Sequence, residues 1–257
     1  MKLIICSAIV LAVSALSGQN ERVCEPTPVY LDPYYVIDEK HTEKSMCTTT
    51  KFLTNSIAWN TTFTVANDDL SVVKSYVRAQ LVLKDLQIAS IQSIPATISH
   101  AYTGESFVST VVLDMYIGTK SDTTTMSQVT SMTKETSMIH LPSPSIRILV
   151  VLATYGNGSL TWLVTKLLTV QIGNDKFDLY EGYLDGFTVY TFVIYTGTKA
   201  FNGDLIEFIK RLPQGKTIDE SQYLFSVQGG SQIFCGTNAM YEATEFMVDY
   251  KVKTLAM

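Results

Sequence analysis

The chain has 257 residues, of which 46% are hydrophobic and 17% are charged, and its formal net charge is −5. This length suffices for one sizeable hydrophobic core, and the low charge content excludes an intrinsically disordered chain. The mild acidity argues against a nucleic-acid-binding surface. Because Thr, Val, Ile, Tyr and Phe are abundant, the composition favours strands over helices.

The N-terminal segment has the features of a secretory signal peptide. One lysine precedes an apolar run from Leu3 to Leu16, and the small residues Ala15 and Ser17 form a cleavage site of the small-x-small type. The run is too short to span a bilayer. We therefore predict a signal peptide over residues 1–17 and a secreted, mature domain over residues 18–257, with a buried N-terminal helix as the alternative.

Secretion makes the cysteines interpretable, since disulfides persist outside the cell. Cys6 leaves with the signal peptide, which leaves Cys24, Cys47 and Cys235. We predict a bridge between Cys24 and Cys47, which would close a loop of modest length. Cys235 then remains unpaired and is interpreted as a small buried hydrophobic residue rather than a reactive thiol.

Strand-like runs follow one another along most of the mature chain. They cover residues 56–65, 73–83, 91–102, 105–118, 146–156, 166–183, 187–196 and 222–227. Their spacing predicts an antiparallel sandwich or barrel rather than alternating strands and helices. The wholly apolar run at 148–153 fits a strand covered on both faces, although a buried helix shares this pattern. The glycines at 156–159 and 228–230 are predicted to form turns.

Two segments depart from the strand pattern. Residues 204–212 have apolar side chains at helical spacing, with Asn202 or Asp204 as a cap and Pro213 at the end, and so predict one amphipathic helix. Residues 119–145 are rich in Thr and Ser, show little periodicity, and predict a long surface loop.

Motifs that would indicate a cofactor or a metal are missing from the sequence. The histidines His41, His100 and His140 are far apart, and no phosphate loop, dinucleotide fingerprint or nucleophile elbow occurs. We therefore predict no cofactor and no metal. N-glycosylation sequons begin at Asn60 and Asn157, which fits a secreted chain.

The order of several segments resembles glycoside hydrolase family 12, the family of secreted endoglucanases and xyloglucanases. The most specific segments are VKSY, the I-x-S-I-P run, the DLYEGY and TVYTFV block, the lone helix before QYL, and QGGSQIFCGTNA. The similarity runs from about Cys24 to Tyr250 and is strongest to members from plant-associated microbes. It implies an all-β fold, a curved antiparallel β-sandwich of the jelly-roll, concanavalin-like type. A cleft would cross the concave sheet, and one helix would lie on the back.

The resemblance also implies retaining hydrolysis of β-1,4-glucan by two glutamates, one nucleophile and one acid/base. The nucleophile belongs to a strand that here reads RILVVLA, so Arg147 takes its position. The acid/base belongs to a segment that here reads GSQIFCG, so Gln232 takes its position. An aspartate next to the nucleophile is retained as Asp114. The prediction is that no catalytic pair is intact and that Arg147 pairs with Asp114.

Shifting the alignment does not restore a carboxylate. The sequence has no Asp or Glu between Glu135 and Asp175, and none between Glu220 and Glu242. An arginine cannot act as nucleophile or base because it stays protonated, and an amide has no acidic proton to give. Glu105 and Glu181 are the remaining candidates, although Glu181 is expected to be solvated.

The sugar-binding platform is also expected to be reduced. The family carries a tryptophan after the first cysteine, whereas this region offers the tyrosines Tyr30, Tyr34 and Tyr35. Trp59 aligns with a strand of the sandwich, and Trp162 is the other tryptophan of the chain. We therefore expect weak glucan binding.

Three functions from different classes remain. The sequence favours a catalytically inactive family 12 relative that acts by protein binding outside the cell, as a decoy or effector, with a host inhibitor or receptor as partner. The alternatives are a β-glucan- or xyloglucan-binding protein without turnover and a residual glucanase. The chain is expected to be a secreted monomer without a membrane span.

Overall fold

A computed structural model of the chain describes residues 21–24, 29–32, 35–41, 46–67, 69–119, 144–157, 160 and 163–254. Several sequence predictions concern residues outside these ranges: the signal peptide over 1–17, nearly all of the loop at 119–145, His140, Tyr34, Trp162 and the end of the second sequon.

Strands make up most of the described chain, which confirms the all-β prediction. Their bounds are β1 (Glu21–Val23), β2 (Val29–Asp32), β3 (Tyr35–His41), β4 (Cys47–Phe52), β5 (Ile57–Val65), β6 (Ser75–Gln87), β7 (Ile91–Ser93), β8 (Pro95–Gly118), β9 (Pro144–Tyr155), β10 (Thr165–Ile172), β11 (Asp175–Leu184), β12 (Phe187–Ile194), β13 (Ala200–Asp204), β14 (Tyr223–Val248) and β15 (Lys251–Val252). A short 3₁₀ turn (Ile88–Ser90) and one helix, α1 (Ile206–Lys210), complete the elements.

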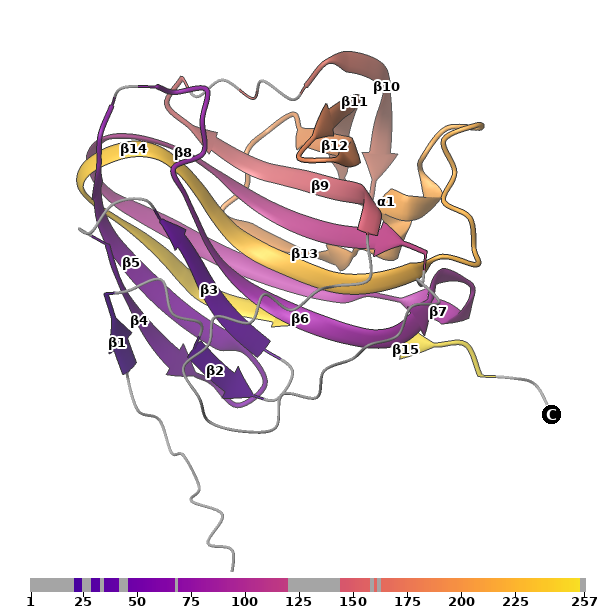
Figure 1. Cartoon of the computed structure of the whole chain (residues 1–257), viewed down its shortest axis with the longest axis horizontal. Helices are drawn as coiled ribbons and strands as arrows, with labels where there is room; N and C mark the ends of the chain where they lie inside the picture. The colour runs from indigo at the N-terminus through magenta and orange to yellow at the C-terminus, as the bar shows by residue number, and fades with distance from the viewer. Residues whose placement is uncertain are drawn as a thin grey trace, which may run out of the picture.

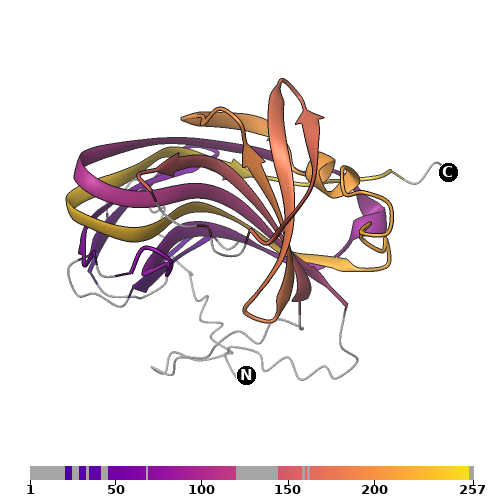
Figure 2. The same ribbon diagram turned by 90° about the horizontal axis from the view of Figure 1, so that it is seen from above.

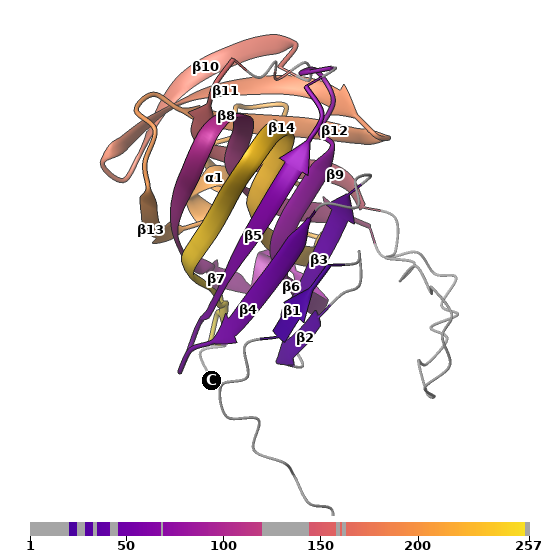
Figure 3. The ribbon, with the colours of Figure 1, turned by 90° about the vertical axis from the view of Figure 1, so that its left-hand side faces the viewer.

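The strands form two curved layers, and β8 and β14 run through both (Figures 1 and 2). The inner layer has the order β2-β3-β6-β14-β8-β9-β12-β11-β10, and the outer layer has the order β1-β4-β5-β14-β8-β13. Neighbouring strands are antiparallel except β9 and β12, which are parallel. Figure 3 shows β1, β4, β5 and β14 side by side in the outer layer. The predicted curved sandwich is therefore confirmed.

The continuity of β8 and β14 corrects two sequence predictions. Residues 91–102 and 105–118 were expected to be separate strands, but most of this region forms the single strand β8, which bends where Gly104 and Ser106 have positive φ values of 99° and 57°. Residues 228–230 were expected to form a turn, yet they lie inside β14. Gly230 is needed there because a Cβ would come within 2.0 Å of the Val77 carbonyl oxygen.

The helix packs on the back of the sandwich, as predicted, but it is shorter than expected. Strand β13 takes residues 200–204, and the Asp204 carboxylate accepts hydrogen bonds from the backbone N–H groups of Ile94 and Ile206. Phe208 of α1 is fully buried and meets Phe177 and Phe192 edge-on, with ring centroids 5.2 and 5.1 Å apart. These contacts anchor α1 to β11 and β12 through the main core.

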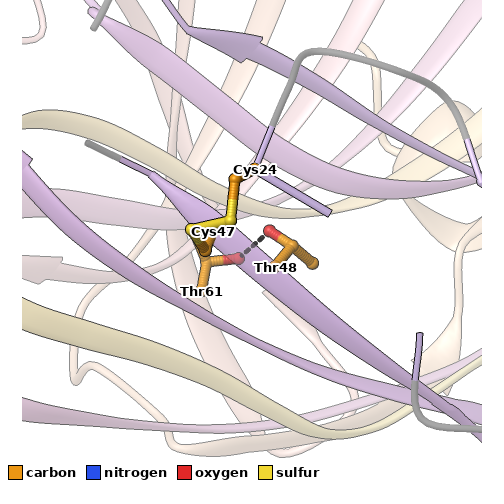
Figure 4. The surroundings of a disulfide bond; sticks show 4 residues. All are labelled: Cys24, Cys47, Thr48 and Thr61. Atoms are coloured by element: carbon orange, nitrogen blue, oxygen red, sulfur yellow. Dashed lines mark hydrogen bonds between the residues drawn. A yellow bond between two sulfur atoms is a disulfide. The ribbon is translucent and has the colours of Figure 1, made fainter. Parts of the chain in front are cut away.

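The predicted disulfide between Cys24 and Cys47 is present and joins the end of β1 to the start of β4 (Figure 4). Beside it the buried hydroxyls of Thr48 and Thr61 are 2.6 Å apart and link β4 to β5. The bridge therefore holds the N-terminal edge of the outer layer against its neighbour.

Replacing both Cys24 and Cys47 with serine is expected to lower the free energy of unfolding by about 3 kcal/mol, because the bridge closes a loop with a separation of 23 residues. Urea unfolding followed by circular dichroism measures this change. A thiol reductant should destabilise the natural protein by the same amount and leave the double variant unchanged. Equal midpoints for both proteins without reductant would contradict the prediction.

Candidate functional site

The candidate site lies on the face of the inner layer that is turned away from the outer layer, the concave face in Figure 2. Strand alternation decides which side chains reach it. On β8 the residues Val111, Leu113 and Met115 join the main core between the layers, whereas Asp114 and Tyr116 point to the opposite face.

Asp114 and Arg147 form a buried ion pair at the centre of this face. The Arg147 guanidinium donates from Nε to both carboxylate oxygens, at 2.9 and 3.0 Å, and from Nη2 to Oδ2 at 2.5 Å. The Asp114 side chain is fully buried and that of Arg147 is 8% exposed. Burial alone lowers the pKa of Arg147, but the Asp114 carboxylate outweighs this effect and raises that pKa. The predicted pairing is confirmed.

Two tyrosines surround the ion pair. The Arg147 guanidinium carbon lies 5.4 Å from the ring centroid of Tyr116, and the Phe187 ring meets the same tyrosine edge-on at 5.5 Å. Tyr76 of β6 is buried, and the guanidinium of Arg78 lies 4.8 Å from its ring centroid. Burial, and after it the Asp114 carboxylate, raises the pKa of both Tyr76 and Tyr116. Both hydroxyls therefore remain protonated and able to donate.

The register of β14 against β8 places Gln232 away from the ion pair. On β14 Gln228 is the partner of Asp114, whereas Gln232 is the partner of Thr110, whose hydroxyl donates to the Gln232 amide oxygen at 3.2 Å. Four residues along a strand span about 13 Å. The residue that the structure places across from Asp114 is therefore Gln228, which the sequence did not indicate.

An apolar cluster lies on the concave face around the strand positions of Asp114 and Gln232. Its buried members are Tyr76, Val112, Leu149, Val151, Val189 and Phe234. Val151 stands where the family resemblance expects a tryptophan, so this position offers an aliphatic side chain, whereas Tyr76 and Phe234 supply the rings of the cluster. Tyr116 and Phe187 supply further rings beside Arg147, and the reduced aromatic platform after the first cysteine stays a prediction.

The other candidate carboxylates do not join the ion pair. Glu105 pairs with Thr237 near the bend of β8. Glu181 is partly solvated, with a side chain 24% exposed, and its carboxylate accepts a hydrogen bond from Lys216 at 2.8 Å. Across the described ranges, no group of three or more His, Cys, Asp or Glu side chains is arranged to hold a metal.

The remaining predicted residues have structural positions. Trp59 is buried in β5 and packs edge-on against Tyr241 and Phe246. Cys235 is buried and unpaired, as predicted, and burial raises the pKa of its thiol. Tyr30 and Tyr35 lie on β2 and β3 at the edge of the inner layer.

Sequence comparisons place the chain among known proteins. The family model described as Glycosyl hydrolase family 12 matches residues 35–251. A protein of Phytophthora sojae (strain P6497) named xyloglucan-specific endo-beta-1,4-glucanase 1 is 32% identical over 206 residues, which cover 79% of this chain and 78% of that protein. A protein of Aspergillus niger (strain ATCC MYA-4892 / CBS 513.88 / FGSC A1513) named probable xyloglucan-specific endo-beta-1,4-glucanase A is 31% identical over 195 residues, which cover 76% of this chain and 73% of that protein.

Solved structures agree on the fold. Endoglucanase 3 of Trichoderma harzianum has a TM-score of 0.74 and 22% identity, and the match covers 92% of this chain and 99% of that one. The catalytic domain of Humicola grisea Cel12A has a TM-score of 0.72 and 20% identity, with 90% of this chain and 99% of that one covered.

These relatives correct the functional expectation. The sequence favoured an inactive protein that acts by protein binding, but the relatives that share about four fifths of the chain are named as glucanases that act on xyloglucan. The sequence argument rested on two substituted positions, Arg147 and Gln232, whereas the fold of the whole sandwich is preserved. In the described part of the chain, no helix is long and apolar enough to cross a membrane.

Proposed function

The chain belongs to glycosyl hydrolase family 12, and on that premise we propose that it is a glucanase-type protein directed at β-1,4-linked glucans of the xyloglucan type. The names of its relatives support this substrate class. The preserved two-layer fold supports it as well, because solved endoglucanases share this curved sandwich.

The observation that carries the proposal is the cluster of Asp114, Arg147, Tyr116 and Gln228 at the centre of that face. It combines a carboxylate, a guanidinium, an amide and a tyrosine ring within neighbouring strands. Polysaccharide sites use this combination, since sugar hydroxyls need donors and acceptors while the apolar face of a pyranose stacks on an aromatic ring.

Turnover is proposed to be slow. Retaining hydrolysis uses two carboxyl groups about 5–5.5 Å apart. We propose that Arg147 occupies the nucleophile position and that the acid/base position is an amide, Gln232 by sequence motif or Gln228 by strand register. Because an amide cannot donate a proton as an acid and a guanidinium cannot attack the anomeric carbon, the rate should lie more than about 10² to 10⁴ below that of a relative with both carboxylates.

We also propose that the protein is secreted. The disulfide between Cys24 and Cys47 fits an oxidising compartment. We propose N-glycosylation at Asn157, which is exposed in the turn after β9, and at Asn60, which is half-buried on β5. A host protein partner and the monomeric state stay predictions.

The proposal is tested with xyloglucan in affinity electrophoresis and in an assay for released reducing ends. The natural protein should be retarded in the gel and should release reducing ends slowly. Tyr116→Ala should weaken retardation about tenfold, because it removes the ring beside Arg147. Tyr250→Ala is the control, since Tyr250 lines a separate hollow with Phe52 and Met247. A natural protein that is neither retarded nor able to release reducing ends would overturn the proposal.

A further inference from the structure

The ion pair of Asp114 and Arg147 presents its positive side to the concave face. Asp114 is fully buried, whereas the Arg147 side chain keeps 8% of its surface exposed. The Asp114 carboxylate accepts the hydrogen bonds that Nε and Nη2 of the guanidinium donate. Among the described residues, Nη1 has no acceptor within hydrogen-bonding distance. A ligand that reaches the cluster therefore meets N–H donors and positive charge first.

Two further polar groups beside the pair are buried without a partner in the described part of the chain. They are the Tyr76 hydroxyl, on a residue 7% exposed, and the Gln228 amide oxygen, on a residue 4% exposed. Buried polar atoms are nearly always hydrogen-bonded, since leaving one unpaired is costly. Gln228 is the strand partner of Asp114, and Tyr76 interacts electrostatically with Asp114 and Arg147. Because Tyr76 is the strand partner of Gln232, it approaches the ion pair from a different level than Gln228, and the place between these two side chains lies on the concave face.

We propose that this place binds a sugar unit that carries a carboxylate, a uronosyl unit within a β-1,4-linked glycan. The carboxylate accepts hydrogen bonds from Arg147 Nη1 and from the Tyr76 hydroxyl, and a sugar hydroxyl donates to the Gln228 amide oxygen. The inference rests on the proposed function, because it names the substrate class of the same concave face.

The chemistry of the donors favours the acid over a neutral sugar. A guanidinium matches a carboxylate in geometry and charge, and such charge-assisted bonds are about twice as strong as neutral ones. A neutral hydroxymethyl group at the same carbon would accept the hydrogen bonds but gain nothing from the charge. The glutamate that the family resemblance expects at position 147 would repel a carboxylate, so the arginine reverses the preference.

The probes are cellotetraose and its fully C6-oxidised counterpart, which share a backbone and differ in the group at C6. Isothermal titration should show that the oxidised tetramer binds about tenfold more tightly at low ionic strength. The difference should shrink as salt is added, because a charge interaction is screened.

Two variants locate the effect. Tyr76→Phe removes one hydroxyl, and the pair Asp114→Asn with Arg147→Gln removes both charges without leaving either one buried alone. Each should reduce the preference for the oxidised tetramer by about fivefold or more. Arg211→Gln, which removes a positive charge after α1 on the back of the molecule, is the control and should keep the preference.

The outcomes separate this inference from the proposed function. Binding of neutral cellotetraose that equals or exceeds binding of the acid overturns the inference and leaves the proposed function standing. Failure of both tetramers and of xyloglucan to bind overturns both. A preference that persists in Tyr76→Phe and in the double variant, or that Arg211→Gln also loses, places the acid elsewhere and overturns the inference.

Discussion

Replacing Asp114 with asparagine is expected to lower the free energy of unfolding by about 3–5 kcal/mol, because the Arg147 guanidinium is then buried without its counter-ion. The carboxylate is fully buried and accepts all three bonds that the arginine donates to it. Urea unfolding at neutral pH, followed by tryptophan fluorescence and by circular dichroism, measures the change.

Two comparisons isolate the cause. Asp178→Asn breaks an ion pair with Lys166, whose side chain is 46% exposed, and should change stability by less than about 1 kcal/mol. The double variant Asp114→Leu with Arg147→Met replaces the buried pair by apolar side chains and should recover most of the loss. If Asp114→Asn costs no more than Asp178→Asn, the ion pair is not held as the structure describes.

The ion pair is also the part of the site that the sequence predicted best. Once Asp114 and Arg147 are placed on adjacent strands with their side chains on one face, a charge in that position needs a partner nearby. The family resemblance supplied this placement, and the cost of burying an unpaired charge supplied the pairing. The disulfide was predictable for a comparable reason, since secretion and the loss of Cys6 left few ways to pair the cysteines.

The position of Gln228 across from Asp114 could not be predicted in this way, because it depends on the register in which the two strands pair. A motif identifies Gln232 from its neighbours in the chain, but only the pairing of β14 with β8 shows which residue lies across from Asp114. The same limit explains the mistaken turn at residues 228–230. Gly230 allows β6 to approach β14 closely, and this contact is invisible in a local pattern.

Restoring carboxylates is expected to raise the rate of reducing-end release from xyloglucan by about 10²-fold or more, and the register decides which pair succeeds. Arg147→Glu supplies the nucleophile beside Asp114 and is common to both designs. The second glutamate replaces either Gln228 or Gln232. Strand β8 lies between β14 and β9, so the backbones of β14 and β9 are about 10 Å apart. Two glutamates on β14 and β9 can approach each other over β8 only if they stand at similar positions along their strands.

Gln228 pairs with Asp114, which pairs with Leu149, only two residues from Arg147. Gln232 pairs with Thr110, which pairs with Thr154, seven residues from Arg147. Arg147→Glu with Gln228→Glu should therefore gain activity, while Arg147→Glu with Gln232→Glu should match the Arg147→Glu single variant. Circular dichroism and thermal unfolding must first show that all three proteins are folded, since a second carboxylate beside buried Asp114 brings two like charges close together. The reverse order of activities would mean that β14 pairs with β8 in a register shifted by four residues when glucan is bound, because only such a shift brings position 232 opposite Asp114.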